Sequence, residues 1–426
     1  MFDPRYDILL NIMKIKTVER SYDEVCRIKA PEHIRPKKPN RALGMLMKIL
    51  SAPDLKAVGF KYEIEDPERI GTGPRLILMN HSSFLDLEIA SRMIKEPYNI
   101  VCTSDGLVGK ENLMRSLGCI PTKKFVTDVR LISDLKYAVK TNRTSVLMYP
   151  EASYSFDGTA TKLPRKMGVL FKALSVPVCM ITTYGSFTRD PLYNNLQKRK
   201  VNVSATMKCL LTPEEIKAKS IEEIDGILDE AFSFDYFRWQ KDNNIRITEK
   251  FRADGLNRIL YKCPHCMKEG DTEGLGTTFV CHNCGALYDM DEFGSLESRA
   301  GNTRFSHIPD WYAWERECVR KEVKDGTYCL DTDVKIGMIV DYKALYMVGS
   351  GHLRHDPSGF ALTGCDGKLK YTQGPHKCYS CYSDYYWYEI GDVICIGDNK
   401  ALYYCFPDKK DVVAKTRIAT EEIYAL

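Results

Sequence analysis

The sequence predicts a multidomain protein of the α/β class, in which a mixed sheet flanked by helices is followed by a small cysteine-rich ribbon and a β-rich C-terminal domain. Three observations lead to this prediction: strand-like and helix-like patterns alternate over residues 74–185, two Cys-x2-Cys pairs stand within residues 263–284, and aromatic and β-branched residues dominate from about residue 306. A chain of 426 residues is too long for one ordinary core, so several domains are expected.

Changes in composition set the expected domain boundaries. We place an N-terminal helical and basic region at residues 1–55, the α/β domain at 56–245, the ribbon at 255–300 and the β-rich domain at 301–426. Hydrophobic residues make up 44% of the chain and charged residues 28%, as in soluble globular proteins. The net charge of +4 is too small to indicate a nucleic-acid partner.

Targeting signals and cysteine usage narrow the cellular compartment. The first residues do not resemble a signal peptide, and no apolar run approaches the length needed to span a membrane. Sixteen cysteines in such a chain favour reduced thiols and metal ligands over a disulfide framework. We therefore expect a cytoplasmic protein.

The N-terminal region contains a linker and a short helix. Residues 31–39 are basic and rich in proline, which predicts an extended linker. Residues 41–50 are apolar with positive charge at the edges, which is typical of helices that lie on a membrane surface. A helix packed on its own domain explains the pattern slightly better, because the segment is short and nearly apolar all round.

The α/β domain is predicted from the alternation of two patterns. Apolar runs predict buried strands at 76–79, 100–102, 145–149, 176–183 and 201–211, and helices are expected at 85–94, 111–117, 164–174 and 221–237, with another that begins after Thr212. Ligands of such sheets bind at the carboxyl ends of the strands. Residues that directly follow a strand are therefore the candidate site residues.

The segment from Asn80 to Asp86 directly follows the first of these strands. It places His81 at a strand-to-helix turn, where a neutral imidazole can take a hydroxyl proton while the Asp86 carboxylate fixes its tautomer. On one continuous helix, residues five apart point about 140° apart, so the pair can meet only if His81 precedes the first turn. A second interpretation needs no catalysis, because Ser83 and Asp86 have the spacing of a capping box.

Four segments resemble, in order and spacing, the motifs of the glycerolipid acyltransferases, the family of 1-acylglycerol-3-phosphate acyltransferase. They are Asn-His-x4-Asp at residues 80–86, Gly-Cys-Ile-Pro-Thr-Lys-Lys at 118–124, Tyr-Pro-Glu at 149–151 and Val-Pro-Val at 176–178, so the resemblance covers about residues 40–240. It implies that His81 is the catalytic base and Asp86 its orienter. The expected substrate-binding residues are Asn80, Lys123, Lys124, Glu151, Ser153 and Lys166.

The chain departs from the family pattern in two motifs. Lys124 stands where the second motif usually has arginine, and the third motif continues as Ala152-Ser153-Tyr154 in place of the usual Gly-Thr-Arg. Tyrosine supplies no positive charge to a phosphate, which puts the usual acceptor in question. Basic residues near these motifs offer a replacement, namely Lys123, Lys124, Lys162, Arg165 and Lys166.

Two cysteine pairs predict a metal site. Cys263, Cys266, Cys281 and Cys284 have the C-x2-C-x14-C-x2-C spacing of two knuckles around one tetrahedral ion. Zinc suits four thiolates in a reduced compartment, and four protein ligands leave no open position for catalysis, so a structural zinc is expected. Iron is the minority alternative. A segment this short needs the metal in order to fold.

Short strands are predicted for the C-terminal domain. Residues 384–390, 393–396 and 402–406 have the pattern of adjacent strands joined by hairpin turns, and a closing helix is expected at 419–424. A small barrel or sandwich would result. A second metal site is suggested by His376, Cys378 and Cys381, but no fourth ligand has suitable spacing, so free thiols are favoured.

The resemblance leads to one functional hypothesis with one competitor. It implies an O-acyltransferase, peripheral on the inner face of the membrane, that transfers a fatty acyl group from acyl-CoA or acyl-carrier protein to a lysophospholipid hydroxyl in phospholipid biosynthesis, with 1-acylglycerol-3-phosphate as the expected acceptor. The competing hypothesis is a non-catalytic protein that binds lipid or another protein through a degenerate acyltransferase domain. Nucleic-acid binding is not expected, since only the ribbon favours it.

Overall fold

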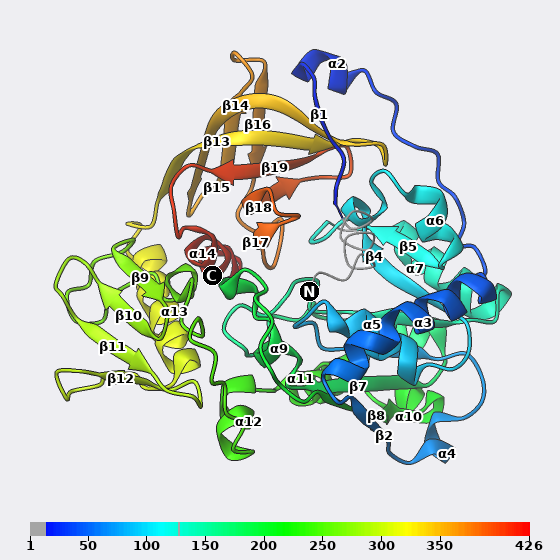
Figure 1. Cartoon of the computed structure of the whole chain (residues 1–426). Helices are drawn as coiled ribbons and strands as arrows, with labels where there is room; N and C mark the ends of the chain where they lie inside the picture. Colours follow the sequence, from blue (N-terminus) through cyan, green and yellow to red (C-terminus); the bar gives the residue numbers. More distant parts are fainter. Residues whose placement is uncertain (1–13, 127) are drawn as a thin grey trace.

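The computed structural model describes residues 14–126 and 128–426 and contains three sheets (Figure 1). A seven-stranded sheet with its helices forms the lower part of the view in Figure 1, a four-stranded ribbon lies to its left, and an eight-stranded sheet lies above both. The predicted class is confirmed: a mixed sheet is flanked by helices, and the C-terminal region consists of antiparallel sheet.

The seven-stranded sheet has the order β2-β8-β7-β3-β6-β4-β5. All neighbouring strands are parallel except β7 and β8, so the sheet is mixed. The strands are β2 (Lys61–Ile64), β3 (Leu76–Met79), β4 (Tyr98–Thr103), β5 (Cys119–Thr122), β6 (Ser145–Met148), β7 (Val178–Tyr184) and β8 (Ser204–Leu211). Each strand that the sequence predicted is present. The two additional strands, β2 and β5, lie at the two edges of the sheet. Strand β5 contains Pro121, whose missing N–H is tolerated at an edge.

The central strand β3 is buried on both faces. Leu76 and Leu78 pack into the core beneath α7, α8 and α11, whereas Ile77 and Met79 pack beneath α3 and α5. Every residue of a strand that is buried on both faces is apolar, so the strand could be predicted from a continuous apolar run in the sequence. The helices of this domain are α3 (Arg41–Ala57), α4 (Pro67–Ile70), α5 (Leu85–Met93), α6 (Glu111–Ser116), α7 (Val129–Lys136), α8 (Met167–Leu174), α9 (Ser186–Arg189), α10 (Pro213–Ala218), α11 (Ile221–Phe232) and α12 (Tyr236–Asp242).

Two predicted helices differ from the observed ones. The helix expected at 221–237 is divided, because Asp235 caps a new helix by accepting a hydrogen bond from the Arg238 N–H. The helix expected from residue 164 begins only at Met167, since Lys166 has a left-handed backbone with φ 63°. Helix α10 begins after Thr212 as the sequence predicted, and the structure adds a capping box between Thr212 and Glu215.

The ribbon is a four-stranded antiparallel sheet in the order β12-β11-β10-β9. Its strands are β9 (Thr272–Leu275), β10 (Thr278–Cys281), β11 (Leu287–Met290) and β12 (Leu296–Ser298). A helix, α13 (Ile308–Lys324), follows where β-structure was expected from the sequence. The helical spacing of the buried residues Ile308, Trp311, Val319 and Val323 is the signal that was overlooked.

The C-terminal sheet has the order β16-β15-β14-β13-β19-β18-β17, and β1 (Thr17–Glu19) from the N-terminal region pairs in parallel with β14. Its strands are β13 (Leu330–Ile339), β14 (Leu345–Asp356), β15 (Gly359–Gly364), β16 (Leu369–Gln373), β17 (Tyr382–Trp387), β18 (Gly391–Gly397) and β19 (Leu402–Pro407). The three strands predicted after residue 380 are adjacent, and the closing helix α14 covers Val413–Tyr424.

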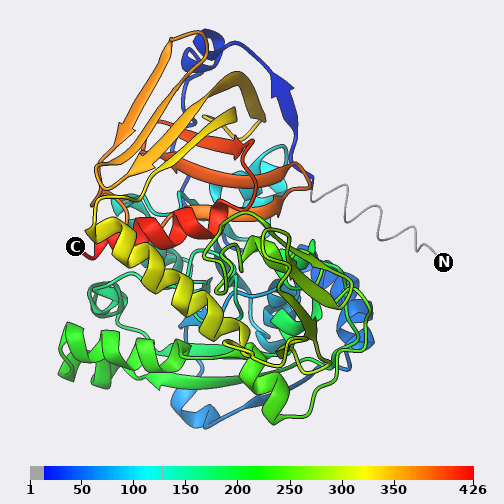
Figure 2. The ribbon, with the colours of Figure 1, turned by 90° about the vertical axis from the view of Figure 1, so that its left-hand side faces the viewer.

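Helices α13 and α14 lie side by side between the C-terminal sheet and the rest of the molecule (Figure 2). Ion pairs join them, since Arg316 lies 2.7 Å from Glu421 and Arg320 lies 2.7 Å from Glu422. Helix α14 also contacts β17 and β18. In the residues that the structure describes, no helix combines the length and apolar character needed to cross a bilayer.

Candidate active site

The candidate site forms at the carboxyl ends of β3 and β6. These strands are parallel neighbours, with Leu78 opposite Met148, so the residues that follow them meet at one edge of the sheet. His81 follows β3 and Glu151 follows β6. The main-chain N–H of His81 donates to Glu151 Oε2 at 2.9 Å, which brings the first and third motifs together.

The imidazole of His81 is hydrogen-bonded to Asp86. Nδ1 of His81 lies 3.0 Å from Oδ2 of Asp86. Helix α5 begins at Leu85, so His81 precedes the first helical turn, as the pairing requires. Because Nδ1 donates to the carboxylate, Nε2 is the nitrogen left to accept a proton from a substrate.

The capping interpretation and the pairing with His81 coexist. Oδ2 of Asp86 also accepts the main-chain N–H groups of Ser82 at 2.8 Å and Ser83 at 3.1 Å. A full capping box is absent, since the Ser83 hydroxyl accepts from the Leu85 N–H and donates to Asp190 Oδ1 at 2.6 Å. Three donors on one buried carboxylate oxygen fix both the helix start and the imidazole.

Residues 149–161, here called the third-motif loop, pack around His81. Glu151 Oε1 accepts from the Thr161 N–H at 2.8 Å while Oε2 holds the His81 N–H, and the Ser155 N–H donates to the His81 carbonyl at 3.1 Å. Glu151 is 2% exposed, and burial raises the pKa of its carboxyl to about 7. Ser153 is buried beside it, with its hydroxyl 3.5 Å from the Glu151 carbonyl. The loop therefore positions the main chain of His81.

Asn80 connects β3 to neighbouring elements. Its Oδ1 accepts from the Thr183 N–H at 3.0 Å, and its Nδ2 donates to the Tyr236 hydroxyl. Asn80 is 6% exposed. Its amide is thus engaged by β7 and α12 in this structure.

Two tyrosine rings pack against the imidazole. The ring centroids of Tyr149 and Tyr154 lie 4.3 Å and 3.9 Å from that of His81, both in stacked orientation. The His81 side chain is 17% exposed. Burial lowers the pKa of His81, Asp86 opposes this effect and Lys124 adds to it. A lowered pKa keeps the imidazole neutral, which a general base requires.

The basic residues predicted around the cleft have different surroundings. Lys124 stacks its ammonium 4.0 Å from the Tyr382 ring centroid, and burial lowers its pKa against the opposing effect of Asp105 and Asp384. Lys123 Nζ donates to the Asn399 carbonyl at 2.7 Å. Lys166 is exposed at the start of α8, where its N–H donates to Asp225. Arg165 pairs with Asp229, and Lys162 is exposed.

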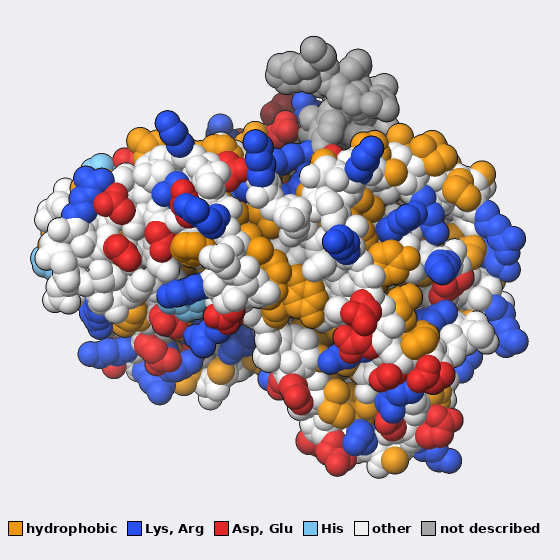
Figure 3. All heavy atoms as spheres, turned by 60° about the horizontal axis from the view of Figure 1, so that its bottom comes forward, with side chains coloured by type: hydrophobic (Ala, Val, Ile, Leu, Met, Phe, Trp, Pro, Cys, Tyr) orange, Lys and Arg blue, Asp and Glu red, His pale blue; other side chains and the backbone are white. Residues whose placement is uncertain are grey.

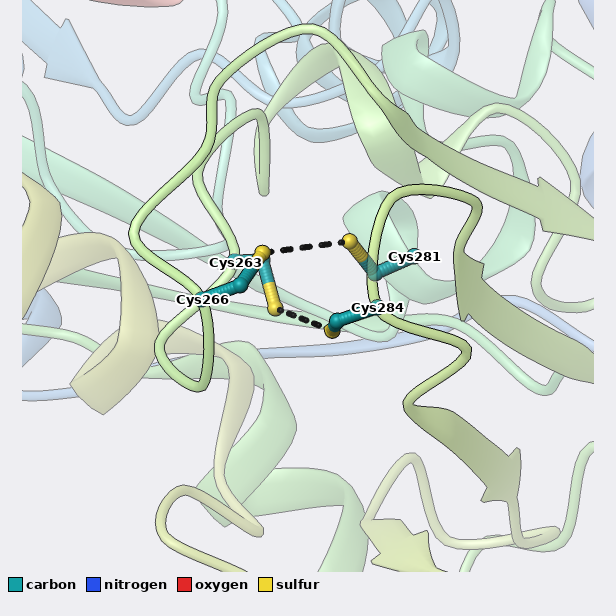
Figure 4. A group of neighbouring side chains, drawn as sticks. All are labelled: Cys263, Cys266, Cys281 and Cys284. Atoms are coloured by element: carbon teal, nitrogen blue, oxygen red, sulfur yellow. Dashed lines mark hydrogen bonds between the residues drawn. The ribbon is translucent and has the colours of Figure 1, made fainter.

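The four cysteines of the ribbon gather as the spacing predicted. The two knuckles face each other, with Cys263 Sγ 3.8 Å from Cys284 Sγ and Cys266 Sγ 3.7 Å from Cys281 Sγ (Figure 4). All four sulfurs lie within 4.8 Å of one another. A tetrahedral zinc with Zn–S bonds of about 2.3 Å places sulfurs roughly 3.8 Å apart, so the site fits a metal such as zinc.

No second metal cluster of this kind occurs among residues 14–126 and 128–426. Cys378 Sγ donates to the Phe125 carbonyl at 2.9 Å, and Cys381 is buried as a free thiol.

Several groups reach the site from the C-terminal domain, and sequence reasoning missed them. Tyr382 donates to Asp105 Oδ2 at 2.9 Å, and Arg417 donates to the Tyr154 carbonyl in the third-motif loop. The negative charge of Asp384 opposes the lowering of the Lys124 pKa by burial. These residues stand more than 200 positions after the motifs, and nothing in their own segments marks them as site residues.

Comparison with known proteins assigns the central part of the chain. Residues 61–185 match the protein family described as Acyltransferase. Among solved structures, the chain is similar to the 1-acyl-sn-glycerophosphate (LPA) acyltransferase PlsC from Thermotoga maritima, with 15% identity, a TM-score of 0.34, and coverage of 45% of this chain and 78% of that chain. A search of curated proteins gave no match. Residues 61–185, which contain β3, His81, Asp86 and Glu151, therefore form an acyltransferase domain.

Proposed function

We propose that the protein is an O-acyltransferase that moves a fatty acyl group from acyl-CoA or acyl-carrier protein to the hydroxyl of a lysophospholipid. The observation that carries the proposal is the 3.0 Å contact between His81 Nδ1 and Asp86, which leaves Nε2 as an acceptor in a matched acyltransferase domain. The same carboxylate oxygen also receives the main-chain N–H groups of Ser82 and Ser83, which fix its position relative to the imidazole.

The chemistry needs no nucleophile from the enzyme. Nε2 of His81 takes the acceptor hydroxyl proton as the oxygen attacks the thioester carbonyl. The C–S bond then breaks, the thiolate leaves, and the proton on Nε2 neutralises it. Asp86 stabilises the transient imidazolium. The products are an ester and a free thiol.

Thiol release measured with a chromogenic disulfide tests this proposal. Release that depends on both an acyl thioester and a lysophospholipid is expected. Its absence with every donor and acceptor tried would favour the competing hypothesis of a non-catalytic lipid- or protein-binding protein.

We propose 1-acylglycerol-3-phosphate as the acceptor. Lys124 supports this choice, because its positive charge lowers the pKa of His81 and it follows the second motif, whose basic residue the family resemblance gives to the acceptor. A phosphate would replace the stacking on Tyr382 with charged hydrogen bonds.

Lys124→Ala should raise the KM for 1-acylglycerol-3-phosphate about tenfold or more, as roughly 1.5 to 3 kcal/mol of charged hydrogen bonding implies. Added salt should likewise raise the KM of the unsubstituted protein for this acceptor. Steady-state rates over a panel of lysolipids measure the effect, with Lys217→Ala on the exposed face of α10 as the control. Faster reaction with phosphate-free acceptors than with 1-acylglycerol-3-phosphate would contradict the acceptor while leaving the acyltransferase proposal intact.

We propose that the protein binds the inner face of the cytoplasmic membrane through α3. Met45, Leu46, Ile49 and Leu50 on this helix are 38–61% exposed although they are large and apolar. Helix α3 also carries Arg41 and Lys48. Figure 3 presents one face of the molecule, where hydrophobic side chains lie among basic and acidic ones. Such a surface gains from burial in a lipid interface and from anionic headgroups.

The double substitution Met45→Glu and Ile49→Glu should reduce sedimentation with phosphatidylglycerol vesicles at least about tenfold, since it removes apolar burial and adds charge repulsion. The matched control is Leu275→Glu, because Leu275 is 65% exposed on the ribbon. Equal vesicle binding by parent and double variant would exclude α3 as the membrane contact.

A further inference from the structure

The C-terminal helix holds the loop that encloses His81. Arg417 of α14 donates from Nη1 to the Tyr154 carbonyl at 3.2 Å. Its guanidinium carbon lies 3.4 Å from the centroid of the Phe156 ring, two residues further along the loop. Arg417 is 3% exposed and Phe156 2%. The buried guanidinium of Arg417 therefore contacts the third-motif loop at the Tyr154 carbonyl and at the Phe156 ring.

Arg417 is itself fixed by its own domain. Its Nε donates to the Ser383 hydroxyl at 3.0 Å and its Nη2 to the Ser383 carbonyl at 2.6 Å, both on β17. Phe156 packs against Tyr385 of the same strand at a centroid distance of 4.4 Å. A guanidinium held by three hydrogen bonds and an aromatic face has little freedom, so it can transmit the position of β17 to the loop.

Tyr154 connects this anchor to the imidazole. It occupies the position of the arginine that the third motif usually carries, yet its ring stacks on His81 at 3.9 Å with an interplanar angle of 28°. On the same loop, the next residue, Ser155, donates its N–H to the His81 carbonyl. A displacement of Tyr154 would thus move the ring that stacks on the His81 imidazole and also the Ser155 N–H that donates to the His81 carbonyl.

We infer that the C-terminal domain is a working part of the active site, in which Arg417 positions Tyr154 and Tyr154 positions and shields the imidazole of His81. The inference rests on the proposed function of His81 as general base. Tyr154 and Arg417 are positioning residues, since Arg417 bonds the loop and Tyr154 contacts the imidazole. The substitution of the motif arginine by tyrosine then marks a different way of fixing the histidine.

The charged and titratable groups around His81 determine the sign of the expected pH effect. Asp86 faces it from α5, Lys124 from the loop after β5, Glu151 at its main-chain N–H, and the Tyr149 phenol after β6. Burial lowers the His81 pKa, so water admitted beside the ring should let that pKa rise towards or above the ordinary value of 6.5, because Asp86 still favours the charged form. The neutral fraction then falls at mildly acidic pH.

Tyr154→Ala in the full-length protein should lower kcat about 10- to 100-fold, as expected when a reacting group is misplaced by a fraction of an ångström or more. The acid limb of kcat/KM should move to higher pH, while the acceptor KM should change little. Tyr154→Phe keeps the ring and should retain the parental pH profile. Arg417→Met should move the acid limb of kcat/KM to higher pH as Tyr154→Ala does, and Arg417→Lys should move it less.

Lys415→Met is the matched control, because Lys415 is a cation on the same helix that pairs with Glu269 and Glu322 and does not contact the loop. Circular dichroism and metal content establish that each variant is folded. The reactivity of His81 towards diethyl pyrocarbonate, followed by mass spectrometry across pH, gives a readout that does not depend on turnover. We expect faster modification in Tyr154→Ala and Arg417→Met than in the parent.

Two outcomes would overturn the inference. One is a folded Arg417→Met or Tyr154→Ala protein with the parental pH profile and parental His81 reactivity. The other is a change in acceptor KM alone, which would make Tyr154 a substrate contact. If the parent releases no thiol but both variants unmask His81 to the reagent, the proposed function fails and the positioning of His81 stands.

Discussion

The His81→Ala protein should lose acyl transfer by about 10²- to 10⁴-fold, because the general base is gone. Thiol release with saturating donor and acceptor measures the loss. The alanine fits the site without strain, since the main-chain N–H of His81 donates to the Glu151 carboxylate and its carbonyl accepts from the Ser155 N–H, and neither bond involves the imidazole. Circular dichroism and metal content should therefore match the parent.

Asp86→Asn provides the graded comparison. An amide oxygen can still accept one of the three hydrogen bonds that Oδ2 now receives, so this variant should be impaired less than His81→Ala. His352→Ala is a matched control, because His352 is 43% exposed on β14 and pairs with Asp331 and Asp333. Acyl transfer at the parental rate by His81→Ala would refute the catalytic role and leave Asp86 as a helix cap.

Cys281→Ser should reduce bound zinc from about one ion per chain to nearly none, because a four-cysteine site that loses one thiolate no longer closes a tetrahedron. The ribbon supports α13 through Trp311, whose indole Nε1 donates to the Lys262 carbonyl at 3.0 Å, next to Cys263. Trp311 is fully buried and packs edge-on against Phe279 and Tyr288. Loss of metal should expose this indole and shift tryptophan fluorescence to longer wavelength.

Metal analysis of the purified chain, before and after dialysis against a chelator, measures the zinc content, and tryptophan fluorescence reports the exposure of Trp311 together with that of the other three tryptophans. Cys329→Ser is the control, since Cys329 is an exposed free cysteine outside the cluster. A parent protein that contains no metal, or a Cys281→Ser protein that retains it, would contradict the zinc site. Iron in place of zinc would keep the geometry and change only the ion.

Local patterns in the sequence were sufficient to predict those elements whose own residue types depend on where the element lies in the fold. The run Leu76–Met79 is buried on both faces and therefore is apolar throughout, and its helix follows at the expected spacing. The cysteine spacing likewise predicted which four sulfurs meet, because two knuckles bring two ligands each to one point. The sequence allowed the pairing of His81 with Asp86 beside the capping interpretation, because His81 precedes the first turn of the helix that contains Asp86.

Apolar runs, their alternation with helical patterns and the spacing of two Cys-x2-Cys pairs were enough to predict the class of fold, the strand that presents His81 and the four sulfurs of the ribbon. The position of β17 and α14 against the third-motif loop became apparent only in the folded chain. That contact joins Arg417 to Tyr154 and Tyr382 to Asp105 across more than 250 residues, through hydrogen bonds that leave no periodic pattern in either segment. The fold also puts Lys166 on an exposed helix start and Lys124 in the cluster, since charge and spacing alone do not tell a solvated lysine from one buried against a second domain.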